Sequence, residues 1–185
     1  MTEHTVRSFS QDLEELTGDL ARMGGLAEDM LSDAIQAIAT RDLALAETVV
    51  ARDPQIDNLQ VEAEKKILRL LALRQPLARD LRQTISALKI ASELERIGDL
   101  AKSIAKRVKL VDKIEPTAAL KGVARMGKLV NAQLKRVLDA YSALETEAAS
   151  RVWSRAHALM DQMLDDVRRP PCASRVSLRG SSAHT

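Results

Sequence analysis

With 185 residues, 45% of them hydrophobic but only 2% aromatic, the chain has enough apolar side chains for a core of Leu, Ile, Val and Ala. Such a core suits helix-on-helix packing better than a β-sandwich. Residues 1–167 hold 24 basic and 26 acidic side chains, a net charge of −2, so the body of the protein shows no electrostatic footprint for nucleic acid.

The sequence lacks the residues that several classes of protein function need. Cys172 is the only cysteine, which excludes a disulfide framework and a thiolate metal site. None of the three histidines lies in Glu-x-x-His, which argues against a ferritin-type di-iron oxidase. No phosphate-binding glycine loop, G-x-S-x-G or Cys/His pair occurs, so we do not expect an enzyme. The polar start lacks the apolar core of a secretory signal, and no apolar run approaches the roughly 18 residues that span a bilayer. We expect a cytoplasmic protein without membrane insertion.

Helical periodicity runs from Phe9 to about Val167. An apolar stripe between Leu13 and Ile38 predicts the first helix, and Asp42 is a plausible N-cap for the second. At Asp53-Pro54 a helix either starts or kinks. Pro76 predicts a boundary at Gln75.

Three further helices are predicted: Leu77 to Val111, Thr117 to Leu144 and Glu145 to Val167. The short connections favour antiparallel neighbours. The last stretch, 168–185, is rich in Ser, Arg and Pro and has no helical period, so we expect a disordered basic tail.

An internal repeat relates the two halves of the chain. Residues 21–24 and 124–127 both read ARMG, and apolar positions stay in phase at the same separation of 103 for some thirty residues. The register pairs Leu31 with Leu134 and Ala37 with Ala140. We therefore predict an all-α antiparallel bundle with a three-helix repeat over 1–112 and a partial, two-helix second repeat over 116–167.

Two carboxylates, Glu95 and Asp99, stand one turn apart late in the third helix. Helical phase places them opposite the apolar stripe that starts at Ile90 and ends at Val108, and Lys102 and Lys106 follow on their face. One interpretation is a solvated face on which Lys102 offsets the repulsion of the two acids. The other is a carboxylate pair that binds a hard cation or iron.

More acids lie near helix starts. Asp53 and Asp57 read as caps or solvated ends, or as further ligands of the same cation. Asp80 is flanked by Arg79 and Arg82, which either neutralise it or, with Arg74, form an anion-reading or docking patch.

Residues 68–107 resemble the PhoU family, the accessory proteins of the phosphate-specific transport system. The segments that carry the resemblance are ALRQPLARDLR and LERIGD, with DPQIDNL at 53–59, and the likeness extends from about residue 9 to about residue 155. It implies a fold of two repeated three-helix bundles. It also implies a metal site at an E(D)xxxD motif, here Glu95 to Asp99, for iron, zinc or another divalent cation.

The resemblance further implies a negative regulator of phosphate uptake and of phosphate-starvation signalling. Its partners would be the phosphate ABC transporter and a sensor histidine kinase, with Arg74, Arg79, Asp80, Arg82 and Arg96 as docking residues. The alternatives are a metal-binding bundle and a structural scaffold without regulatory activity. The second copies of the ALRQP and ERIGD segments are absent, and Asp53 corresponds to Ala156. Because an incomplete second repeat would expose apolar positions, we expect a homodimer.

Overall fold

The computed structural model describes residues 2–74, 78–111 and 118–143, together with residues 145, 147, 149–152, 154 and 161. Its helices are α1 (Thr2–Thr40), α2 (Leu43–Arg74), α3 (Ala78–Lys106), α4 (Val108–Val111) and α5 (Ala118–Ser142). No strand occurs in these described residues, and the predicted all-α fold class is confirmed. The predicted fifth helix and the predicted tail lie largely or wholly outside them.

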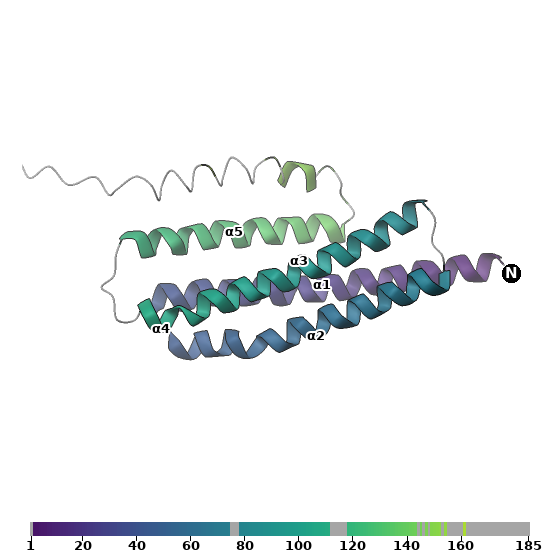
Figure 1. Ribbon diagram of the computed structural model, residues 1–185. Helices are drawn as coiled ribbons and strands as arrows, with labels where there is room; N and C mark the ends of the chain where they lie inside the picture. Colours follow the sequence, from purple (N-terminus) through teal and green to yellow (C-terminus); the bar gives the residue numbers. More distant parts are fainter. Residues whose placement is uncertain are drawn as a thin grey trace, which may run out of the picture.

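α1 is the central helix of the bundle (Figure 1). It packs against α2, α3 and α5, and α2 and α3 also pack against each other, whereas α5 contacts α1 alone among the described helices. The largest fully buried apolar side chains gather where α1, α2 and α3 meet, and they are Leu16, Leu20, Met23, Met30, Val49, Ile56, Ile67 and Val108. The first three helices therefore form one closed core, to which α5 adds a single further layer.

The turn between α1 and α2 consists of Arg41 and Asp42. Arg41 adopts a left-handed conformation with φ of 61°, and the backbone N–H of Asp42 donates to the carbonyl of Ala37 at 3.0 Å, which closes α1 with a Schellman motif. The Oδ1 atom of Asp42 then accepts a hydrogen bond from the backbone N–H of Leu45 at 2.9 Å. The predicted N-cap role of Asp42 is confirmed, and the turn sends α2 back along α1.

α2 continues through Pro54 without starting there. Asp53 and Asp57 therefore lie inside the helix, and their interpretation as caps was wrong. A proline inside a helix removes one backbone hydrogen bond and crowds the preceding turn. The buried side chains of Val49 and Ile56, one on either side of Pro54, hold both halves of α2 in the core and offset that cost.

The buried face of α3 differs from the predicted one. Its members recur at alternating spacings of three and four and are Thr84, Ala87, Ala91, Leu94, Gly98, Ala101 and Ala105. The buried Val108 continues the same spacing on α4. Most of these residues are small, so α3 can approach its neighbours closely. A Cβ atom on Gly98 would lie 3.0 Å from Cδ1 and Cγ2 of Ile56 on α2. The helix also ends at Lys106, and a turn at Arg107 separates it from α4.

The contact between α1 and α5 is reciprocal. A Cβ atom on Gly24 would lie 2.6 Å from Cδ2 of Leu138, and a Cβ atom on Gly127 would lie 2.5 Å from Cγ1 of Ile35. Gly24 and Gly127 are 103 residues apart, and so are Ile35 and Leu138. The two antiparallel helices thus place side chains 103 residues apart over glycines 103 residues apart, an arrangement that agrees with the repeat register read from the sequence.

Candidate functional site

Four predicted site residues meet between α2 and α3. Asp53 and Asp57 are one turn apart on α2, and Glu95 and Asp99 are one turn apart on α3. Ile56 of α2 lies against Gly98 of α3, and this close approach brings the two carboxylate pairs opposite each other. The neighbouring carboxylates contribute to raising the pKa of Asp57 and of Glu95.

Lys102 joins the two helices within this group. Its Nζ atom lies 2.5 Å from Oδ2 of Asp53 and 2.8 Å from Oδ1 of Asp99. The predicted contact between Lys102 and Asp99 is therefore present. The contact with Asp53, 49 residues earlier, was missed, because it depends on the register between two helices. We call Asp53, Asp57, Glu95, Asp99 and Lys102 the carboxylate–lysine cluster.

Asp53 is the most buried member of the cluster. Only 8% of the residue is exposed, and its Oδ1 atom has no hydrogen-bond partner among the described residues. A buried carboxylate is tolerated when a cation pairs with it, and the ammonium of Lys102 fills that role on the Oδ2 side. The Oδ1 atom of Asp53 remains an acceptor without a hydrogen-bond partner among the described residues.

The electrostatics of the cluster follow from this arrangement. Partial burial and the neighbouring acids, Asp99 first, raise the pKa of Glu95 above its usual value. Partial burial and the charge of Asp53 raise the pKa of Asp57 in the same direction. The hydrogen bond from Lys102 lowers the pKa of Asp99, and the hydrogen bonds to Asp53 and Asp99 raise the pKa of Lys102. The lysine therefore stays charged, while two carboxyl groups ionise less readily than in water.

The predicted placement of Glu95 and Asp99 opposite the core needs correction. Glu95 is half-buried and borders the seam between α2 and α3, and Asp99 is exposed at the edge of the same seam. The buried face of α3 passes through Ala91 and Gly98, one position from where the isoleucines had suggested it, because small residues rather than large ones contact α2. The two acids consequently flank an interface between helices.

The metal prediction stays a prediction. Within the described part of the chain, no three or more His, Cys, Asp or Glu side chains are placed so that they could hold a metal ion. Carboxylate oxygens suit hard cations such as Mn²⁺, and the Oδ1 atom of Asp53 has no hydrogen-bond partner among the described residues. As the side chains are arranged, however, they fit the ammonium of Lys102 rather than a resident metal ion.

The predicted docking residues fall in two places. Arg82 is exposed and Asp80 half-buried near the start of α3, whereas Arg96 is exposed about 21 Å further along the same helix. The side chains of Arg74 and Arg79 lie outside the described ones. These five residues therefore do not form one compact patch.

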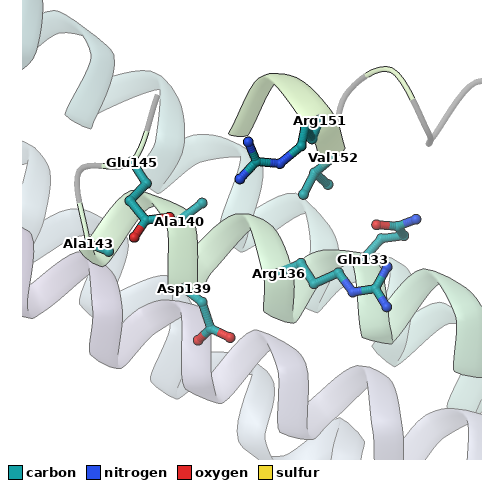
Figure 2. A pocket seen from close by; sticks show the side chains of 8 residues that line it. All are labelled: Gln133, Arg136, Asp139, Ala140, Ala143, Glu145, Arg151 and Val152. Carbon is teal, nitrogen blue, oxygen red and sulfur yellow. The ribbon is translucent and has the colours of Figure 1, made fainter. Parts of the chain in front are cut away.

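A pocket of 380 Å³ opens on α5 (Figure 2), and no residue of the carboxylate–lysine cluster lines it. It lies between the second half of α5 and the segment that carries Arg151 and Val152. Its charged lining residues are of both signs, Asp139 and Glu145 beside Arg136 and Arg151. This mixture favours no single class of ligand.

No described helix combines the length and the apolar character needed to cross a bilayer.

Comparison with known proteins identifies relatives over most of the chain. The PhoU domain matches residues 20–108. A "Phosphate-specific transport system accessory protein PhoU homolog" from Caulobacter vibrioides (strain NA1000 / CB15N) is 52% identical over 156 residues, which cover 84% of this chain and 68% of that relative. A protein of the same name from Zymomonas mobilis is 40% identical over 149 residues, covering 80% of this chain and 63% of the relative. The chain thus spans about two thirds of the length of these curated relatives.

Solved structures agree with the sequence comparison. The crystal structure of PhoU from Pseudomonas aeruginosa superposes with a TM-score of 0.73 at 32% identity, covering 86% of this chain and 82% of that one. The phosphate transport system regulatory protein PhoU from Streptococcus pneumoniae gives a TM-score of 0.78 at 30% identity, with coverages of 86% and 74%. Both the sequence and the helical bundle place this chain in the PhoU family.

Proposed function

We propose that this chain is an accessory protein of a phosphate-specific transport system. In this role it acts in the cytoplasm and holds down both phosphate uptake and phosphate-starvation signalling by binding a phosphate ABC transporter and a sensor histidine kinase. The observation that carries the proposal is the 52% identity over 156 residues to a relative named for this transport system. A regulator of this kind works by preferring one state of its partners, since equal binding to both states shifts nothing.

The end of the bundle where α2 leads into α3 suits partner docking. Large apolar side chains are exposed there on both helices, namely Leu68, Leu73, Leu81 and Ile85. The exposed side chains of Arg69 and Arg82 accompany them. Apolar residues mixed with arginine are typical of protein–protein interfaces. We assign the docking role to this end, with Arg82 as its central cation, and not to the distant Arg96.

Complementation tests the regulatory role. A bacterial strain without its own PhoU protein, carrying a phosphate-starvation reporter, would express this chain in phosphate-rich medium. We expect the reporter to fall to near the level of the parent strain. Arg82→Glu should restore reporter activity, whereas Arg125→Glu, which reverses an exposed arginine on α5, should repress like the unmodified chain. Immunoblots would confirm equal abundance.

A chain that is equally abundant yet leaves the reporter on would contradict the regulatory role. The alternative would then be a metal-binding bundle or a scaffold without regulatory activity. The carboxylate–lysine cluster is the feature that would favour metal binding, and stoichiometric metal lost in the Glu95→Ala/Asp99→Ala variant would distinguish that alternative from a scaffold.

We also propose a homodimer. Large apolar side chains on α5 are 38–48% exposed, namely Val123, Leu129, Val130 and Val137, and a second copy could cover them. Light scattering of the purified chain should give twice the monomer mass, and a monomer at micromolar concentration would contradict this expectation.

A further inference from the structure

We propose that the cavity between the second half of α1 and the middle of α5 binds a small phosphate monoester that carries hydroxyl groups, that is, a sugar phosphate. The cavity has a volume of 510 Å³. Small-molecule sites in proteins have volumes of roughly 300–1,000 Å³. The cavity shares no lining residue with the pocket in Figure 2 or with the carboxylate–lysine cluster.

Two lysines of α5 give the cavity a positive side. Lys128 and Lys135 line it, both are exposed, and neither forms an ion pair with a described residue. Two helical turns separate them, about 10 Å along the axis, and their flexible stems allow both ammonium groups to reach one anionic group between them. A phosphate monoester carries a charge of about −1.5 to −2 at pH 7, which matches two lysines.

Neutral polar side chains of α1 line the opposite wall. Ser32, Gln36 and Thr40 follow one another at intervals of one turn. The hydroxyl of Thr40 donates to the backbone carbonyl of Gln36 at 2.9 Å, which leaves Ser32 and Gln36 as the exposed donors. A phosphate group offers three strong acceptor oxygens, so these donors and the two ammonium groups suit it together.

Two acceptors in the same lining require hydroxyl groups on the ligand. Glu28 is half-buried, and an ionised carboxylate only accepts hydrogen bonds. The Oδ1 atom of Asn131 is buried and has no hydrogen-bond partner among the described residues, which is costly for an acceptor. An ionised phosphate group has no proton to donate to either residue. Hydroxyl groups next to the phosphate would supply those donors.

The apolar part of the lining favours a sugar over a nucleoside. It consists of Ile35, Ala39 and Ala132, and none of the described lining residues is aromatic. Nucleotide bases are typically bound by stacking on aromatic or arginine side chains, and this lining offers neither. The two short alanine side chains leave room for a compact, hydroxylated carbon skeleton.

A ligand in this cavity would contact α1 and α5 at once. Among the described helices, α5 contacts α1 alone. The ligand would therefore strengthen the one described contact that holds α5 on the first three helices, and it would stabilise the folded chain by mass action. This inference does not depend on the role of the chain in phosphate transport.

Titration calorimetry of the purified full chain tests the proposal with three probes: glucose 6-phosphate, ribose 5-phosphate and glycerol 3-phosphate. We expect at least one of them to bind, with one molecule per chain, and to raise the melting temperature. Inorganic phosphate should bind at least about tenfold more weakly than that ester, because it offers no hydroxyl donors to Glu28 and Asn131. Glucose, which has no anionic group, should not bind measurably.

Three variants locate the site. Lys128→Gln removes one lining charge and should weaken binding of the ester about tenfold, because a charge-assisted hydrogen bond is lost. Ala132→Leu fills the cavity without changing its charge and should weaken binding at least as much. Arg125→Gln is the matched control, because it removes an exposed charge of the same helix that does not line the cavity, and it should bind like the unmodified chain. Circular dichroism would confirm that each variant is folded.

Failure of all three esters to bind the folded chain would overturn the proposal. Equal affinities for inorganic phosphate and the ester would overturn the assignment of a hydroxylated ligand. An Arg125→Gln variant that loses as much affinity as Lys128→Gln, or an Ala132→Leu variant that loses none, would show that the ester binds outside this cavity.

Discussion

α1 and α5, which the 103-residue repeat pairs in the sequence, have different surroundings in the bundle. On α1, the stripe of Leu20, Ala27 and Ala34 is at most 1% exposed, because α2 and α3 cover it. The corresponding stripe on α5 is Val123, Val130 and Val137, and these valines are 40%, 48% and 43% exposed. Only the mutual contact between the two helices, over Gly24 and Gly127, is alike on both sides.

This difference shows what an apolar stripe can tell. The spacing of apolar residues predicts which side of a helix is apolar, and it does so equally well for α1 and α5. It does not state what covers that side, because coverage comes from other helices. Side-chain volume differs in the same direction at two of these positions. Ala27 and Ala34 of α1, which lie against neighbouring helices, correspond to the larger Val130 and Val137 of α5.

The pocket in Figure 2 fits the same comparison. Two of its lining residues on α5, Gln133 and Ala140, correspond to Met30 and Ala37 of α1. Those two residues of α1 are fully buried by the neighbouring helices. The pocket therefore lies where the first three-helix unit has close packing.

The largest expected effect comes from placing one charge at corresponding positions. Ala27→Asp puts a carboxylate without a partner into the closed core, and we expect it to lower the free energy of unfolding by more than about 3 kcal/mol. Val130→Asp puts the same group on the open side of α5 and should cost less than about 1 kcal/mol. Urea unfolding followed by circular dichroism would compare the two variants.

Equal losses would break the comparison, because Val130 would then be as covered as Ala27. Repeating the Val130→Asp measurement at several protein concentrations would show whether a second copy of the chain covers Val130. A loss of stability that comes from a disrupted contact between two copies depends on protein concentration, whereas a loss within one copy does not.

A second effect of intermediate size concerns the reciprocal glycines. Gly127→Ala should destabilise by about 1–2 kcal/mol, because its Cβ atom would meet the stiff, buried Ile35. Gly24→Ala should cost less, since the end of the Leu138 side chain can rotate away. Gly25→Ala meets nothing within 4 Å and should stabilise by about 0.5–1 kcal/mol. Thermal unfolding would rank the three variants, and a stabilising Gly127→Ala would show that the α1–α5 contact is looser than described.

The sequence predicted much of the bundle but little of how its helices meet. The stripe of α1, the cap at Asp42 and the register of 103 all follow from local spacing, and the structure agrees with the stripe and the cap and supports the register. Pro54 left two possibilities open, a helix start or a kink, and α2 does not start there, because packing on both sides of Pro54 carries the helix through it. Propensity alone does not include that packing.

The candidate site shows the same limit. The four acids could be identified one helix at a time, whereas their grouping depends on the register between α2 and α3. The pairing of Lys102 with Asp53 required the register between the helices, which Gly98 against Ile56 determines. A lysine 49 residues from its partner leaves no periodic signal.

The smallest expected effect concerns an ion pair of α1 and the corresponding charges on α5 and the segment after it. On α1, Asp33 pairs with Arg52 of α2 at 2.7 Å, with both side chains about 30% exposed. The register of 103 replaces Asp33 by Arg136 and Arg52 by Arg155, so the ion pair becomes two like charges. Asp33→Asn should cost less than about 1 kcal/mol, and the loss should shrink in high salt. Arg136→Asp should instead stabilise by a few tenths of a kcal/mol, because it would restore opposite charges if the second unit repeats the packing of the first. Urea unfolding at low and high salt would show whether Asp33→Asn lowers and Arg136→Asp raises the free energy of unfolding. A loss of stability in Arg136→Asp that salt does not change would mean that α5 meets its following segment in another way than α1 meets α2.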